Sequence, residues 1–384
     1  MSRYNFSILQ NRRGTRSYKW DCSKEEISLS IADMDFPVMP EIKEAIRNRS
    51  EVDSYGYSMA SDRYFEAYKN WFGTRYNSHF EKEDCIFSSG IVASLDSVIK
   101  RLTKENDGVL LMTPVYNVFF NIIKNNHRRL LDCPFIYKDY KYEIDWNLLE
   151  EKLKESKALI FCNPHNPIGK RYSKEEIEKI VSLCRKYDVF LLSDEIHCDI
   201  DYNSDRYVSI LSVSDYDKLI TFLSPGKTFN VAGLQSSIMV IKNHELRELI
   251  QKGVYEDDIG EPNYFAIDPV IAAYENGENY VCELNNSLSD NRKLFSHYLK
   301  DNLPHLHLIN NEATYLLWVD ISYYNKPSDI FVKELKEYTG LIVCSGDIYG
   351  DSRFIRVNIA TSKEVINDAL RRLHKYISKL EKEN

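Results

Sequence analysis

Hydrophobic and polar positions follow two alternating patterns between about residue 84 and residue 242. Short continuous apolar runs, typical of buried strands, occur at 85–87, 109–112, 158–162, 189–192, 219–223 and 237–241. Stretches with apolar residues three and four positions apart, typical of helices, begin after Gly90, Tyr116 and Ser173, and Ser173 with Glu176 matches a capping box. This alternation predicts an α/β fold with a mainly parallel, doubly wound sheet.

The pattern changes on both sides of this region. Residues 1–40 are irregular, and helices are predicted from about Pro40 and from about Ser61. Beyond residue 275, a long helical stretch, strands at 315–319 and 354–359 and a final helix indicate a smaller α+β domain. We therefore expect a large ligand-binding domain over 41–275, a small C-terminal domain over 276–384, and an N-terminal segment, 1–40, that packs on the small domain.

Unusual polar groups follow the carboxyl ends of the predicted strands. They are Gly90, Tyr116, Asn163, Asn166, Asp194, Ser224 and Lys227. Ligands of open α/β sheets bind at this edge, so we expect these residues to share one site.

Lys227 follows a buried strand and a Ser-Pro-Gly turn. At such a position a lysine loses hydration and its pKa falls, so that the neutral amine can form a Schiff base with an aldehyde. The pattern favours a lysine that carries pyridoxal phosphate. A solvated lysine in a turn is the alternative.

Three further positions near the ends of predicted strands also allow two interpretations each. Asp194 ends an apolar strand, where it either meets a protonated heterocycle nitrogen or forms a cap or salt bridge. Tyr116 either packs in the core or stacks on a flat ring. The backbone amides of Gly90, Ile91 and Val92 begin a helix and suit a phosphate, although any strand-to-helix turn offers such amides.

Two further stretches carry charge where apolar residues dominate. Arg356 alternates within an apolar strand, so it needs either a substrate carboxylate or a structural salt bridge. The aspartates of Ile31-Ala-Asp-Met-Asp-Phe-Pro37 interrupt a short apolar run, which indicates a loop near a site or a plain surface turn.

Composition narrows the functional classes. The 50 basic and 58 acidic residues of the 384 give a formal net charge of −8, which argues against binding to nucleic acid or to an anionic membrane. No stretch approaches the roughly 20 apolar residues of a membrane span, and no secretory leader is visible. The eight cysteines contain no C-x-x-C pair, so we expect free thiols, no metal and a cytoplasmic protein.

Three motifs carry a family resemblance: Asn163-Pro-His-Asn166-Pro-x-Gly169, Ser193-Asp194-Glu195-x-His197 and Ser224-x-Gly-Lys227-Thr-Phe-Asn230. They resemble the fold type I pyridoxal-phosphate enzymes of the class I/II aminotransferase superfamily. Residues 12–15, 19–21 and 32–37 resemble, more narrowly, the MalY/PatB group of cystathionine β-lyases, also called C–S β-lyases. The resemblance extends from about residue 11 to the last helix.

The resemblance implies a role for each site residue. Lys227 is the Schiff-base lysine, Asp194 the partner of the pyridine nitrogen and Tyr116 the stacking ring, and these three are the catalytic candidates. The further cofactor contacts are Gly90, Ile91, Val92, Asn163, Asn166, His197, Ser224 and Tyr57. Arg356 holds the substrate's α-carboxylate, with Met34, Asp35, Tyr57 and Asn166 nearby. Tyr57 reaches the phosphate of the other subunit, which implies a homodimer with shared active sites.

The implied activity is an α,β-elimination that converts cystathionine or a cysteine S-conjugate into a thiol, pyruvate and ammonia. Gln235 stands where aspartate-type aminotransferases place a phosphate-binding arginine, and His197 where they place a tyrosine. Both differences favour the lyase group. An aminotransferase, which uses the same residues, and a regulator that binds a transcription factor are the alternatives.

Overall fold

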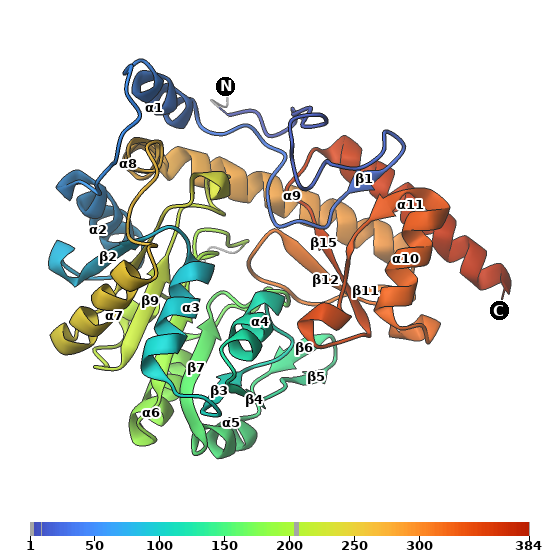
Figure 1. Ribbon diagram of the computed structural model, residues 1–384. Helices are drawn as coiled ribbons and strands as arrows, with labels where there is room; N and C mark the ends of the chain where they lie inside the picture. Colours follow the sequence, from blue (N-terminus) through green and yellow to red (C-terminus); the bar gives the residue numbers. More distant parts are fainter. Residues whose placement is uncertain (1–3, 9, 203–206, 384) are drawn as a thin grey trace.

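A computed structural model describes residues 4–8, 10–202 and 207–383. Its centre is a seven-stranded sheet (Figure 1). The strands, in spatial order, are β2 (Cys85–Ser88), β10 (Ser237–Val240), β9 (Leu219–Leu223), β8 (Phe190–Asp194), β7 (Ser156–Cys162), β3 (Gly108–Leu111) and β4 (Arg129–Asp132). Only β10 runs antiparallel to its neighbours within this sheet. The predicted α/β fold with a mainly parallel sheet is therefore confirmed.

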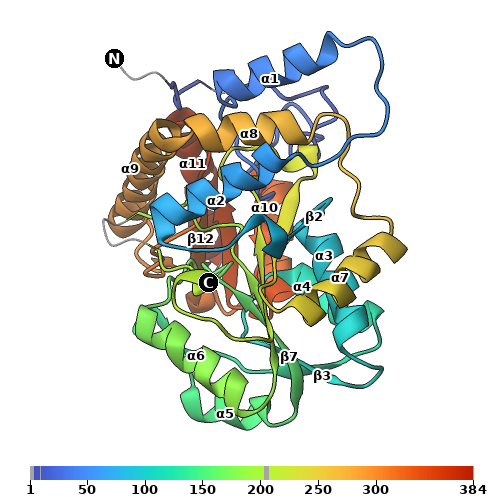
Figure 2. The same ribbon diagram turned by 90° about the vertical axis from the view of Figure 1, so that its left-hand side faces the viewer.

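Helices cover both faces of this sheet because its strands are apolar on both sides. On β3, Val109 and Leu111 join one core cluster, whereas Leu110 joins the other. The first cluster contains side chains of α3 (Ile91–Leu102), α4 (Asn117–Asn125) and α7 (His244–Glu256). The second contains side chains of α2 (Asp62–Tyr76), α5 (Trp146–Leu153), α6 (Lys174–Lys186) and α8 (Ile267–Asn276). Figure 2 shows α3, α4 and α7 on one side of the sheet and α6 on the other.

Local sequence signals predicted one of these elements closely and missed another. Helix α6 begins with the predicted capping box: the Ser173 hydroxyl accepts from the Glu176 amide, and the Glu176 carboxylate accepts from the Ser173 amide. Strand β4 was not predicted, because it is an edge strand in which Arg129 and Leu130 are exposed. Its sequence, Arg-Leu-Leu-Asp, does not form a continuous apolar run.

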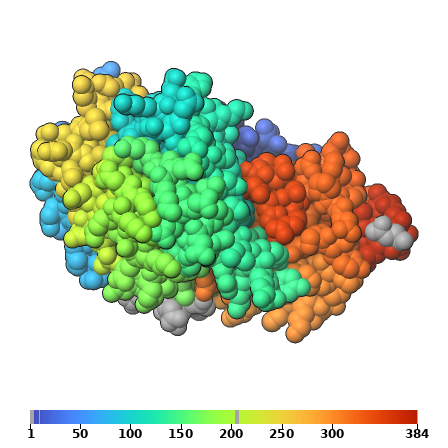
Figure 3. Space-filling view, turned by 90° about the horizontal axis from the view of Figure 1, so that it is seen from below, coloured from blue at the N-terminus to red at the C-terminus, as the bar shows by residue number. Residues whose placement is uncertain are grey.

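The C-terminal part of the chain forms a second, antiparallel sheet. Its strands, in spatial order, are β11 (His307–Leu308), β12 (Leu316–Asp320), β15 (Phe354–Asn358) and β14 (Cys344–Ser345). Helices α9 (Glu278–Asn302), α10 (Ser328–Thr339) and α11 (Lys363–Glu383) accompany it, and a hairpin of β5 (Ile136–Lys138) and β6 (Lys141–Glu143) lies nearby (Figure 1). Seen from below, this part lies beside the large sheet and its helices (Figure 3). The boundary near residue 275 stays a proposal.

The N-terminal residues connect both parts. Strand β1 (Ile27–Ser28) pairs in parallel with β13 (Leu341–Ile342), and α1 (Pro40–Ser50) lies along α8 (Figures 1 and 2). Between β1 and α1 runs the segment Ser30–Phe36, which we call the strap. Its backbone accepts hydrogen bonds from Asn230, after β9, and from Asn358, on β15. The strap therefore joins the two sheets.

One buried carboxylate fixes the strap to the residues before it. Asp35 is 1% exposed. Its oxygens accept from the Lys19 ammonium at 3.0 Å and from the Trp20 indole at 2.8 Å, and Arg12 lies 3.4 Å away. Because two cations and an indole surround this side chain, its charge is compensated within the fold.

We expect Asp35→Asn to destabilise the protein by on the order of 3 kcal/mol, because the buried Lys19 ammonium loses its main anionic partner. Urea denaturation measures this loss. The matched control, Glu275→Gln, removes the charge of a solvent-exposed ion pair with Arg63 and should destabilise the protein far less than Asp35→Asn. Equal losses in the two variants would contradict the stabilising role of the Asp35 cluster.

Candidate active site

A cavity of about 630 Å³ lies at the carboxyl edge of the large sheet. Its walls include most of the residues that the sequence placed there: Gly90, Ile91, Val92, Tyr116, Asn166, Asp194, His197, Ser224 and Lys227. Parallel strands deliver these residues to one edge, since β8 ends at Asp194 and β9 ends just before Ser224.

Lys227 points into this cavity rather than into open solvent. Its Nζ donates a hydrogen bond of 2.6 Å to the carbonyl oxygen of Ala32, in the strap. Burial lowers the pKa of Lys227 to about 8, and the nearby Arg356 cation acts in the same direction, whereas Asp33 and Asp194 oppose it. A substantial fraction of this amine is therefore neutral near pH 8.

Asp194 is buried, and the groups around it balance little of its negative charge. One carboxylate oxygen accepts from the Ile196 amide at 3.1 Å, and no cation of the described residues lies within ion-pairing distance. Burial raises the pKa of Asp194 to about 7. A cationic hydrogen-bond donor in the cavity would satisfy this carboxylate.

His197 faces the same cavity as a neutral ring. Burial, and then the positive charges of Lys227 and Arg356, hold the pKa of His197 well below its usual range. Its Nδ1 has no hydrogen-bond partner among the described residues. The described residues therefore leave the hydrogen-bonding capacity of this buried nitrogen unused.

The N-terminus of α3 borders the cavity with free backbone amides. Gly90 caps this helix with φ at 147°, a region that disfavours side chains, and a Cβ placed there would meet no atom within 4 Å. The first amides of a helix have no partner inside the helix, so those of Ile91 and Val92 are free to bind a phosphate. Ser224, Gln235 and Ser236 line the same cavity.

Arg356 lies in β15, beside Asn166, and makes no ion pair with a carboxylate among the described residues. It donates to Asn166 Oδ1 at 3.3 Å and to the Ser30 carbonyl at 2.9 Å, and it stacks over the ring of Tyr349. Its Nε is buried without a partner. In the described chain the structural salt bridge is thus absent, which leaves the positive charge for a ligand.

Tyr116 lies at the N-cap of α4 and is partly buried in the cavity wall. Its ring packs edge-on against Phe119, with centroids 5.5 Å apart. This contact holds the ring at the cavity wall, where it can stack on a flat ligand.

Five expected site residues do not line the cavity. Arg356 is one of them, and it contacts the cavity wall through its hydrogen bond to Asn166. Met34 and Asp35 are buried in the strap, and Asp35 is already surrounded by Lys19, Trp20 and Arg12. Asn163 is buried behind the edge, where its amide donates to Tyr207 and Val208. Tyr57 is 98% exposed in the single chain. A role for Tyr57 in the site therefore requires another subunit.

The structure adds residues that the sequence did not single out. The Ala32 carbonyl contacts Lys227, and the Tyr315 hydroxyl donates to the same oxygen at 3.0 Å. Asn230 and Asn358 hold the strap. The sequence does mark these two asparagines. Asn230 ends the motif that contains Lys227, and Asn358 lies on the same face of its strand as Arg356.

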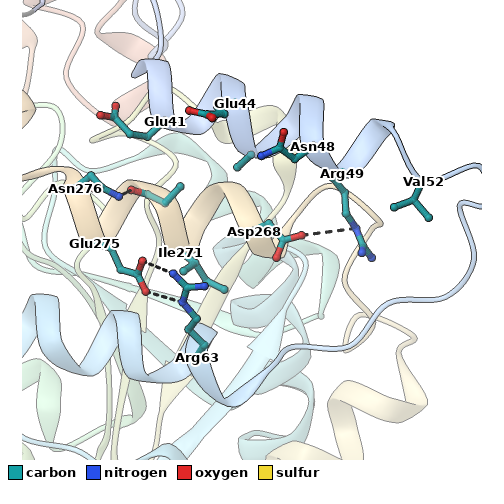
Figure 4. A pocket seen from close by; sticks show the side chains of 12 residues that line it. Glu41, Glu44, Asn48, Arg49, Val52, Arg63, Asp268, Ile271, Glu275 and Asn276 are labelled. Atoms are coloured by element: carbon teal, nitrogen blue, oxygen red, sulfur yellow. Dashed lines mark hydrogen bonds and ion pairs between the residues drawn. The ribbon is translucent and has the colours of Figure 1, made fainter.

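A second cavity, of about 470 Å³, lies between α1, α2 and α8 (Figure 4). Arg63 pairs there with Glu275 at 2.6 Å, and Arg49 faces Asp268 at 3.7 Å. This second cavity shares no wall residue with the cavity that contains Lys227. Across the described ranges, no His, Cys, Asp and Glu side chains gather in a group that could hold a metal ion, and no helix is long and apolar enough to span a membrane.

A family model, "Aminotransferase class I and II", matches residues 24–373. The chain belongs to this family. It is 31% identical to the cystathionine beta-lyase PatB of Bacillus subtilis, over 97% of this chain and 100% of PatB. Within the family it thus belongs to the C–S lyase group.

Solved structures agree with the family and the fold. A pyridoxal-phosphate-bound C–S lyase from Staphylococcus hominis has 34% identity and a TM-score of 0.92, covering 97% of this chain and 98% of that lyase. A pyridoxal-phosphate-bound protein from Clostridium difficile 630, named only provisionally as an aminotransferase, has 33% identity and a TM-score of 0.95, covering 97% and 100%. The expected superfamily and fold are confirmed.

The cofactor of this family member is pyridoxal 5′-phosphate. The cavity fits it in three respects: Asp194 has no cationic partner among the described residues, the N-terminus of α3 offers the free amides of Ile91 and Val92, and Lys227 presents a partly neutral amine. The individual residue roles stay proposals.

The raised pKa of Asp194 gives the cofactor-free protein a defined pH dependence. The protonated carboxyl is favoured in the folded state, so its stabilising contribution is complete below about pH 4 and is lost as the pH rises through about 7. We expect cofactor-free Asp194→Asn to match the wild type near pH 4 and to exceed its stability at pH 8 by on the order of 4 kcal/mol. Denaturation across this pH range measures the difference.

Asp215→Asn is the matched control, because this carboxylate is exposed and pairs only with Arg185 at the surface. It should show no such dependence on pH. A constant difference between wild type and Asp194→Asn from pH 4 to pH 8 would show that Asp194 does not titrate in this range.

Proposed function

We propose that the protein is a C–S β-lyase that eliminates the sulfur substituent of cystathionine or a cysteine S-conjugate and releases a thiol, pyruvate and ammonia. The observation that carries this proposal is the cavity that joins Lys227, Asp194 and Asn166, in a chain 31% identical to a cystathionine beta-lyase. The C–S lyase from Staphylococcus hominis, whose fold this chain shares, supports it.

Recognition of the substrate would rest on Arg356. Its buried guanidinium has no carboxylate partner in the described chain, and its planar fork suits the α-carboxylate of an amino acid. The same guanidinium donates to Asn166 Oδ1, which leaves the Asn166 amide hydrogens directed to other acceptors. Arg356 would thus both bind the substrate and orient Asn166 as a donor to the cofactor's phenolate oxygen.

Proton transfer would rest on Lys227. Bound pyridoxal phosphate supplies an electron sink for a carbanion at the substrate's α-carbon. Asp194 would hold the proton of the pyridine nitrogen, and Tyr116 would fix the plane of the ring. The free Lys227 amine, whose pKa burial lowers to about 8, would then be the base that takes the α-proton.

We expect the purified protein to release pyruvate and a free thiol from cystathionine or from a cysteine S-conjugate. Lys227→Ala should lower this activity by at least about 10³-fold, because both the covalent link and the base are lost. A lactate dehydrogenase assay for pyruvate and a thiol reagent measure the products. Lys218→Ala, at a lysine paired with Asp188, is the matched control and should retain activity.

A transamination would give different products from the same site. The cofactor would end in its pyridoxamine form and would need a 2-oxo acid to return, with no thiol released. Failure to release pyruvate from any sulfur substrate, together with this exchange, would replace the lyase by an aminotransferase.

We further propose a homodimer that shares its active sites. The segment around Tyr57 exposes large side chains, with Met59 80% and Tyr55 61% exposed, and Tyr57 lies outside its own chain's cavity. An apolar surface of this kind is typical of a subunit interface. The cytoplasm remains the proposed location, supported by eight unpaired cysteines.

Mixing two inactive variants tests the shared site. Lys227→Ala and Tyr57→Ala should each be impaired as homodimers. When they are unfolded together and refolded at equal amounts, mixed dimers contain one intact site, so about a quarter of the wild-type activity should return. A mixture no more active than the mean of its two parents would contradict sharing through Tyr57.

A further inference from the structure

The strap is held from the lysine side by one asparagine, which lies three residues after Lys227. Asn230 Oδ1 accepts from the Met34 amide at 3.0 Å, and its Nδ2 donates to the carbonyls of Met34 at 2.9 Å and Phe36 at 3.1 Å. This side chain therefore pairs with the strap backbone as a neighbouring strand would.

A second asparagine holds the strap from the arginine side. Asn358 Nδ2 donates to the carbonyls of Ile31 at 2.6 Å and Asp33 at 2.7 Å. The residue between these two, Ala32, directs its own carbonyl toward Lys227. The position of that carbonyl is thus determined by contacts on both sides of it.

The Ala32 carbonyl is the sole hydrogen-bond acceptor of the Lys227 amine in the described part of the chain. Three other groups act on this amine through their charge: Arg356 disfavours the ammonium form, whereas Asp33 and Asp194 favour it. His197 is neutral and adds no charge. A hydrogen bond from a charged donor is stronger than one from a neutral donor. The carbonyl therefore stabilises Lys227 most after the amine has gained a proton.

We propose that Asn230 is a positioning residue, which holds the Ala32 carbonyl against Lys227 so that this oxygen receives the ammonium formed when the lysine takes a proton. The catalytic meaning of this contact rests on the function proposed above. The contact itself does not, because it exists in the free amine.

The test uses the full-length protein with its cofactor removed, so that the Lys227 amine is free. Asn230→Gly is the preferred variant, because Asn230 has φ at 57°, a conformation that glycine adopts without strain. Acetic anhydride labelling across a pH series, with the Lys227 peptide quantified by mass spectrometry, reports the apparent pKa of this amine. We expect it to fall by about one unit, so that labelling at pH 6 is roughly tenfold faster.

Tyr216→Phe is the matched control. Tyr216 is also buried and its hydroxyl also contacts two backbone carbonyls, those of Cys184 and Val189, but it lies before the start of β9, at the opposite end of that strand from Lys227. It should lower the melting temperature without moving the labelling curve of Lys227. Asn358→Ala, on the other side of Ala32, should move the curve in the same direction as Asn230→Gly and serves if the glycine variant does not fold.

The proposal fails if folded Asn230→Gly or Asn358→Ala leaves the Lys227 curve unchanged, or if Tyr216→Phe moves it equally. An enzyme that releases no pyruvate but shows the expected shift would refute the lyase function and leave the positioning role intact.

Discussion

An amine and a carboxylate lie in one buried cavity of this protein without forming a salt bridge to each other. Lys227 donates instead to a backbone carbonyl, and Asp194 accepts, among the described residues, from a single backbone amide. Burial moves both pKa values toward neutrality, that of Lys227 to about 8 and that of Asp194 to about 7. The rest of the site is arranged around these two groups, and the proposed roles give each of them a partner in the family's cofactor.

The sequence was sufficient for most of the fold and for the composition of the cavity. Continuous apolar runs marked β7, β8 and β9 because those strands are buried on both faces, and the polar residues after them marked the edge. Edge strand β4 was missed because exposed Arg129 and Leu130 give no buried pattern.

Contacts between distant segments could not be read from the chain. Asp35 was expected beside the substrate, but its partners Lys19 and Trp20 lie in an irregular segment whose path no periodicity predicts. The contact of Lys227 with the Ala32 carbonyl involves a backbone atom, which leaves no mark in the choice of side chain. Tyr57 is a further case, since its proposed partner lies on a second copy of the chain.

The antiparallel course of β10 has a consequence for how the two sheets can move relative to each other. The connection from β9 to β10 begins at Ser224, carries Lys227 and returns through Gln235 and Ser236, and the paired strands at both ends tether it. The proposed cofactor attachment at Lys227 and the proposed phosphate contact of Ser224 therefore lie in one tethered connection. Arg356, the proposed carboxylate-binding residue, belongs to the other sheet, so a hinge motion between the sheets would change its contact with the substrate and leave this connection unchanged.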